Sequence, residues 1–173
     1  MPTARPPITP AASFALGAAA GLVAVFLMDL LDYALQGAET DAQREAAKAA
    51  AGGRESPPQG IATKIQNAVG ADLSKSQHAW AGTAVHYALG IAPAAAYAAL
   101  RPSAPWLGAG RGALFGAGLW LLLDEGVNTA TGLSGDPRDY PWPEHARGLA
   151  SHIVFGLVLD GIVRGVERLH ARA

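Results

Sequence analysis

Residues 6–28 read PPITPAASFALGAAAGLVAVFLM, a run of 23 residues without a single Asp, Glu, Lys or Arg. A second run of 24 residues, 77–100, is equally free of these charges, and two shorter apolar runs follow it. Because a helix rises about 1.5 Å per residue, about 20 such residues cross roughly 30 Å of hydrocarbon. The sequence therefore predicts an all-α protein, a four-helix transmembrane bundle.

The predicted spans cover about residues 11–35, 79–100, 107–130 and 144–168. A polar loop, residues 36–77, separates the first two spans and lowers the mean hydropathy of a chain that is 50% hydrophobic and 16% charged. Residues 39–51 of this loop predict an exposed helix, and residues 61–69 predict a short amphipathic helix. This second helix either lies flat on the membrane surface or packs on the bundle. We expect residues 1–173 to form a single integral membrane domain.

Composition excludes several classes of function. A net charge of −1 gives no reason to expect a nucleic-acid partner. The chain has no cysteine, which excludes disulfides, thiolate metal sites and cysteine nucleophiles. The expected partner is the lipid bilayer. Glycine-rich helix faces also predict close helix contacts and a homo-oligomer; these glycines are Gly17 and Gly21, then Gly108, Gly112 and Gly116, then Gly161 and Gly165.

The distribution of basic residues predicts the orientation of the chain. Four crossings place both termini on one side of the membrane. The connection after residue 100 and the C-terminal tail lie on that side, and together they carry Arg101, Arg111, Arg164, Arg168 and Arg172. Because basic residues are retained in the cytoplasm, this pattern predicts cytoplasmic termini and a bacterial inner-membrane location, although the five basic residues of the polar loop oppose it.

Several ionisable or amide side chains interrupt the apolar spans at a similar depth. Because successive helices run antiparallel, these residues fall on one side of the bilayer, roughly 5–14 Å below its surface. An ionisable side chain in hydrocarbon costs a few kcal/mol, so we expect these groups to point inward and share a polar pocket. The set is Asp29, Asp32, His86, Asp124, Glu125, Asn128 and His152.

Helical spacing sets which of these groups share a face. Asp124 and Asn128, four residues apart, share one face. Glu125 lies about 100° from Asp124 on a regular helix, so one of the two acids should face elsewhere. Nearer the other surface, Asp160 is expected to pair with Arg164 at the usual four-residue helical spacing. His145, at a helix edge, is expected to be solvated.

Three uses of the pocket remain open at this stage. His86, Asp124 and His152 could bind a divalent metal, since imidazole and carboxylate ligands suit Zn, Mn or Fe. The same groups suit handling of protons or a polar solute, because a carboxylate beside His can titrate near neutral pH. Alternatively the layer is structural, in a non-catalytic membrane scaffold. An enzyme acting on a lipid or quinone through the same layer is a third reading, and Ser13, Thr83 and Ser151 show no base arrangement for nucleophilic hydrolysis.

The C-terminal half, about residues 80–168, contains a set of distinctive features: His86 with Tyr97, the run Gly112-Ala113-Leu114, Asp124, the turn Pro141-Trp142 with Glu144, and His152 followed by Asp160 and Arg164. In these features it resembles the YagU-like family of small bacterial inner-membrane proteins, a domain of unknown function. The resemblance implies a multi-pass inner-membrane protein and no established reaction. Where that family tends to have a histidine in the third span, this chain has Asp124.

Overall fold

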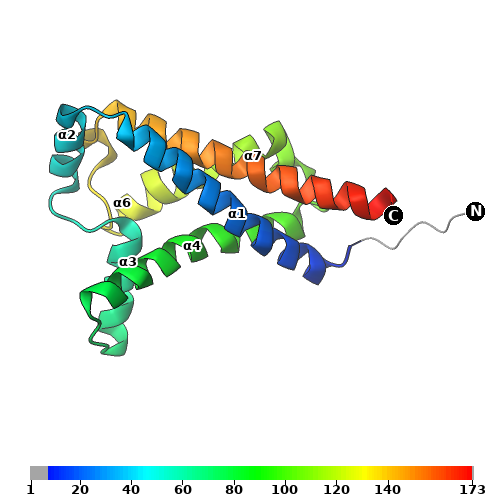
Figure 1. The fold of residues 1–173 in the computed structure, drawn as a ribbon, viewed down its shortest axis with the longest axis horizontal. Helices are drawn as coiled ribbons and strands as arrows, with labels where there is room; N and C mark the ends of the chain where they lie inside the picture. The colour runs from blue at the N-terminus through cyan, green and yellow to red at the C-terminus, as the bar shows by residue number, and fades with distance from the viewer. Residues whose placement is uncertain (1–7, 173) are drawn as a thin grey trace, which may run out of the picture.

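The computed structural model describes residues 8–172. Three long helices, α1 (Pro10–Gly37), α4 (Lys75–Leu100) and α7 (Trp142–Arg172), pack with a fourth segment, Pro105–Ala130 (Figure 1). Each of the four is long and apolar enough to cross a membrane. No strand occurs among residues 8–172, so the predicted all-α four-helix architecture is confirmed.

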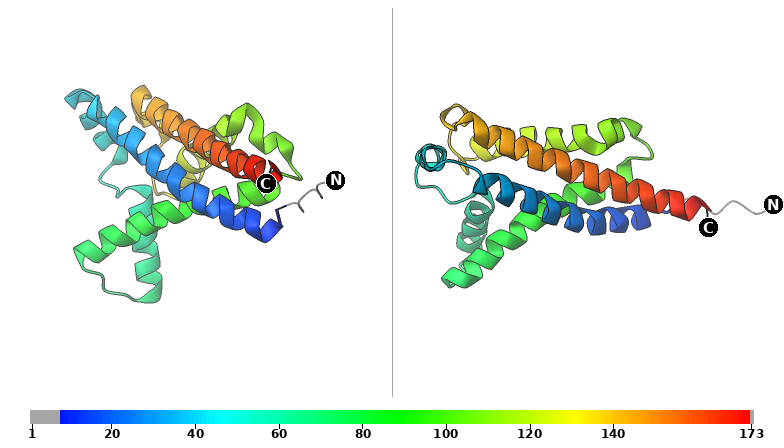
Figure 2. Two further views of the ribbon diagram at one scale, coloured as in Figure 1. Left: turned by 45° about the vertical axis from the view of Figure 1, so that its right-hand side comes forward. Right: turned by 45° about the horizontal axis from the view of Figure 1, so that its top comes forward.

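The polar loop forms the two predicted short helices, α2 (Asp41–Ala51) and α3 (Pro57–Val69). Thr40 and Gln43 form a capping box at the start of α2, and Gly52 ends that helix with φ 59°, a left-handed backbone that favours glycine. Helix α3 packs against α4, and Ala62 is buried between them. Figure 2 shows α3 and the start of α4 diverging together from the other helices. Helix α3 thus packs on α4, and its placement on the membrane surface stays a prediction.

The third span departs most from the prediction of one helix over residues 107–130. It starts with a 3-10 turn, η1 (Pro105–Gly112), in which Ala109, Gly110 and Arg111 leave helical geometry. A regular helix, α5 (Ala113–Trp120), follows. The span then widens into a π-helical segment, η2 (Leu121–Val127), before the short α6 (Asn128–Ala130). The span is thus helical from Ala113 to Ala130, as predicted, and departs from a helix only at its start, at Ala109, Gly110 and Arg111.

Helix α4 also differs at its start, four residues before the predicted residue 79. Ser74 accepts a hydrogen bond from the backbone N–H of Gln77, and the Gln77 side chain accepts one from the Ser74 N–H. This capping box satisfies two amides that an α-helix leaves without partners, so the helix extends into the polar loop. Pro93 lies within α4, which continues to Leu100.

Close contacts between small residues hold the long helices together. A Cβ added to Gly17 would lie 2.5 Å from the carbonyl oxygen of Ala94, and one added to Gly116 would lie 1.9 Å from that of His152. These positions need glycine because the neighbouring backbone occupies the space. Gly21 and Gly112 make similar contacts, so these four glycines serve packing within the chain. A Cβ added to Gly161 or Gly165 would have nothing within 4 Å. Among the glycines considered for oligomerisation, only these two are free of contacts within the chain, and the homo-oligomer stays a prediction.

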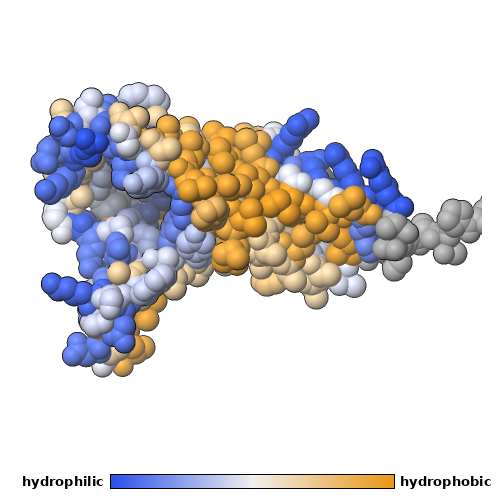
Figure 3. All heavy atoms as spheres, viewed as in Figure 1, coloured by the Kyte–Doolittle hydropathy of each residue, from blue (hydrophilic) through white to orange (hydrophobic). Residues whose placement is uncertain are grey.

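The surface has an apolar band between two polar ends (Figure 3). Large apolar side chains on the outside of this band include Phe26, which is 52% exposed, and Leu121, which is 60% exposed. Such exposure suits lipid contact and is unusual for a protein surface in water. We call the end that carries α2 and α3 the loop end. The opposite end, where α1 begins and α7 ends, carries Arg101 and Arg164, and we call it the arginine end.

Candidate functional site

A cavity of about 430 Å³ opens into the bundle at its loop end. Its walls come from α1, α3, α4, the span Pro105–Ala130, the following loop and α7. Figure 3 shows the polar surface hollowed at this end. Every residue predicted for the polar pocket lines it: Asp29, Asp32, His86, Asp124, Glu125, Asn128 and His152.

On one side of the cavity, α1 and α4 are joined by a carboxylate and an imidazole. The His86 Nε2 lies 2.8 Å from Asp29 Oδ1, and both side chains are about one-third exposed. These residues are 57 positions apart in the chain. The antiparallel pairing of the first two spans brings them to one level, as the depth argument predicted.

The π-helical segment places both Asp124 and Glu125 on the cavity wall. The expectation that one of these two acids faces elsewhere is therefore wrong. That expectation assumed a regular helix, whereas η2 is wider and changes the angle between successive side chains. Single π-helical turns are often found at functional sites. Here the wide turn gives the cavity an additional acid.

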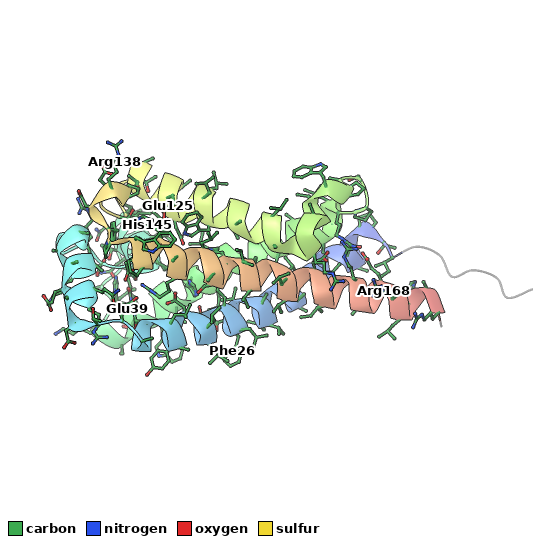
Figure 4. The ribbon with its side chains drawn as sticks, turned by 90° about the horizontal axis from the view of Figure 1, so that it is seen from above. Phe26, Glu39, Glu125, Arg138, His145 and Arg168 are labelled. Atoms are coloured by element: carbon green, nitrogen blue, oxygen red, sulfur yellow. The ribbon has the colours of Figure 1, made fainter. Side chains whose placement is uncertain are left out.

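Glu125 binds His145, which reasoning from the sequence expected to be solvated. The Glu125 Oε1 lies 2.7 Å from His145 Nδ1, and His145 Nε2 donates to the Pro137 carbonyl at 3.0 Å. Figure 4 shows the two labelled side chains adjoining at the loop end. Both ring nitrogens thus face oxygen atoms, so a proton is held between Nδ1 and the Glu125 carboxyl.

Asp124 has weaker partners than the other acids. Its Oδ1 accepts from the Asn128 amide at 3.5 Å, and its Oδ2 lies 3.7 Å from His152 Nδ1. That nitrogen is already used, because it donates to the Gly148 carbonyl at 2.9 Å. The Asp124 side chain is 41% exposed. A carboxylate with spare acceptor capacity therefore faces the cavity.

Arg147 is the central cation of the site, and reasoning from the sequence missed it. Its guanidinium pairs with Asp32 at 2.7 Å, with Glu39 at 2.9 Å and with Glu144. The Glu39 side chain is only 8% exposed. Arg147 therefore connects the end of α1 and the start of α7 with Glu39, which lies two residues before α2. The three-residue spacing of Glu144 and Arg147 indicates a local ion pair on a helix. Nothing in the sequence indicates that Asp32 and Glu39 are also partners of Arg147.

The predicted metal ligands do not meet as one set. His86 pairs with Asp29, whereas His152 lies near Asp124. Within residues 8–172, no three His, Asp or Glu side chains group in a way that could hold a metal ion. We therefore do not carry the metal interpretation of His86, Asp124 and His152 further.

A second polar cluster lies at the arginine end, around the buried Asp160. Asp160 is 1% exposed and accepts hydrogen bonds from Arg164, confirming that predicted pair, and from the hydroxyl of Tyr97 at 2.5 Å. Arg101 lies 3.3 Å from the same carboxylate and donates to Glu167 at 2.6 Å. Each charge has a partner here, which suits a structural role in joining α4 to α7.

Comparison with known proteins places the chain in a family. The sequence pattern described as "Protein of unknown function (DUF1440)" matches residues 42–161, more than half of the chain. The match begins inside the polar loop, whereas the resemblance to YagU-like proteins covers only about residues 80–168. The YagU-like resemblance is more specific than this match and stays a prediction. No curated protein and no solved structure matches the chain. This chain, with four helices suited to cross a membrane, belongs to the DUF1440 family.

Proposed function

We propose that this chain is a multi-pass protein of the bacterial inner membrane whose cavity binds a small polar solute. One observation carries the proposal: polar groups from α1, α4, the third span and α7 converge on an open volume of about 430 Å³. Ligand sites are commonly apolar cavities of this size with a few placed polar groups. The wall also includes apolar residues, among them Leu119, Leu123 and Phe155.

Proton handling is the second candidate, and a specific arrangement favours it. Three histidines each lie beside a different acid around the one cavity: His86 by Asp29, His145 by Glu125 and His152 by Asp124. A histidine beside a carboxylate is a common arrangement for passing a proton. A purely structural layer is the third reading, supported by the way Arg147 ties three acids together.

We further propose that both termini are cytoplasmic, so that the cavity opens toward the opposite side. The five arginines at the arginine end support this orientation: Arg101, Arg111, Arg164, Arg168 and Arg172.

Cysteine labelling can test whether the cavity is open, because the chain has no cysteine of its own. Ser134 lines the cavity, and Ser134→Cys changes one atom of its side chain. We expect a small, charged methanethiosulfonate reagent to label this variant in purified protein. Ser103→Cys, exposed in the connection after α4, is the positive control, and Ala24→Cys, fully buried in the core, is the negative control.

The result would be decisive in either direction. Labelling of Ser134→Cys at a rate near that of Ser103→Cys supports an open, water-filled cavity. A rate as low as that of Ala24→Cys would refute the proposed binding site and favour a filled, structural layer.

A further inference from the structure

We infer that the solute is a small alkylammonium ion whose charged head is held by Asp124. This inference rests on the proposed function, since it names the class of ligand that the same cavity takes.

The first argument is the balance of charge around the cavity. Five carboxylates line it, against one guanidinium and three imidazoles. With the carboxylates ionised, negative charge therefore exceeds positive charge even when all three histidines are protonated. Glu39, which also contacts Arg147, adds to the surplus. A cleft lined by one sign of charge concentrates ions of the opposite sign.

The second argument identifies the carboxylate that is available. Asp29, Asp32, Glu125 and Glu144 each have a histidine or arginine nitrogen within 2.8 Å. The corresponding distance for Asp124 is 3.7 Å, and that histidine nitrogen donates elsewhere. A ligand N–H group can bind Asp124 without breaking a short ion pair.

The third argument is the chemistry of the wall around Asp124. Trp120 and Leu123 line the cavity near Asp124, and Leu119 and Phe155 also line it. Apolar side chains suit an alkyl group, and an indole ring suits an ammonium head because its π-face attracts cations. A compact divalent ion would need several ligands together, and residues 8–172 contain no group of three or more His, Asp or Glu side chains that could hold one. One carboxylate with an apolar surround fits an organic cation better.

Gly148 keeps this region of the cavity accessible. A Cβ at this position would lie 2.9 Å from Trp120 Nε1 and 3.8 Å from Asp124 Oδ2. A side chain at position 148 would therefore have to displace the Trp120 indole. The glycine therefore preserves the pairing of an acid with an aromatic side chain that the ligand requires.

The experiment uses full-length Ser134→Cys protein and two thiol reagents of similar size. One carries a trimethylammonium group and the other a sulfonate. Each labelling rate is divided by the rate of the same reagent with Ser103→Cys. We expect the cationic reagent to react faster than the sulfonate by about tenfold or more, because surplus negative charge in a cleft concentrates cations. Adding Asp124→Asn should reduce that preference several-fold, whereas Asp124→Glu should retain it. The matched control is Asp72→Asn, on an exposed loop residue outside the cavity.

A competition arm then identifies the kind of cation. Propylammonium chloride should slow labelling of Ser134→Cys more than sodium chloride at the same ionic strength, and the difference should disappear in Asp124→Asn. Equal rates for the two reagents, or equal protection by both salts, would overturn the alkylammonium inference and leave the open cavity intact. Absence of labelling by either reagent would instead refute the proposed function itself.

Discussion

The Arg147 Nη1 lies 2.7 Å from Asp32 Oδ2, and this contact joins the first turns of α7 to the last turns of α1 across 115 residues of sequence. Because the same guanidinium also contacts Glu39 and Glu144, a single cation stabilises three carboxylates at the loop end. Figure 4 shows Glu39 on the α1 and α2 side of this region. One side chain thus joins acids from three segments of the chain at the loop end.

Replacing that side chain should destabilise the protein strongly. Arg147→Ala leaves three acids without their cation, and breaking a buried ion pair from one side costs about 3–5 kcal/mol. The measurement is the free energy of unfolding in mild detergent titrated with a denaturing detergent. Arg138→Ala is the matched control, since Arg138 is 92% exposed and should change stability by less than about 0.5 kcal/mol. Equal stability of the two variants would show that the Arg147 network is energetically neutral.

Two glycines in the third span offer a matched pair for helix packing. Gly116→Ala places a Cβ 1.9 Å from a backbone oxygen of α7 and should cost about 1–3 kcal/mol through overpacking. Gly118→Ala, with nothing within 4 Å of the new Cβ, should be neutral or stabilising by roughly 0.5–1 kcal/mol, because alanine favours helix. The same unfolding assay measures both. A Gly116→Ala variant as stable as Gly118→Ala would contradict the close packing of α5 on α7.

The buried acid at the arginine end should depend on Tyr97. Tyr97→Phe removes the hydroxyl that donates to Asp160, where both side chains are 1% exposed. Leaving a buried acceptor with fewer donors costs about 1–3 kcal/mol. Thermal unfolding in detergent should show a lower midpoint for Tyr97→Phe than for Tyr33→Phe, because Tyr33 is 78% exposed. If the two substitutions shift the midpoint alike, the Tyr97–Asp160 bond contributes nothing net.

Sidedness follows from the same cysteine variants in cells. With cytoplasmic termini, an impermeant thiol reagent added to cells with a permeable outer membrane should label Ser134→Cys and spare Ser103→Cys. Disrupting the inner membrane should then expose Ser103→Cys, which lies at the arginine end. Labelling of Ser103→Cys alone in cells with an intact inner membrane would reverse the proposed orientation.

The sequence was sufficient to predict the spans and the level of the polar groups. Uncharged runs of more than 20 residues have few stable alternatives to a spanning helix, and antiparallel succession then places Asp29 near His86. These arguments use only length and order, which the sequence states directly. They needed no knowledge of how any side chain is rotated.

The partners that were missed depend on local geometry instead. The π-helical turn rotated Glu125 toward the cavity, and no residue pattern in 121–127 announced it. His145 and Glu39 looked like surface residues because they lie near span ends. They are partly covered because Glu39 contacts Arg147, and His145 lies between Glu125 and the Pro137 carbonyl. Long-range pairing of this kind requires the packing of the whole bundle to be known.

Helix α7 runs without interruption from Trp142 to Arg172 and carries charged contacts near both ends. Arg147 belongs to the network at the mouth of the cavity, while Asp160 and Arg164 belong to the cluster at the opposite face. Because both clusters include residues of this one unbroken helix, a substitution that shifts α7 at the loop end is expected to disturb the Tyr97–Asp160 contact at the arginine end as well.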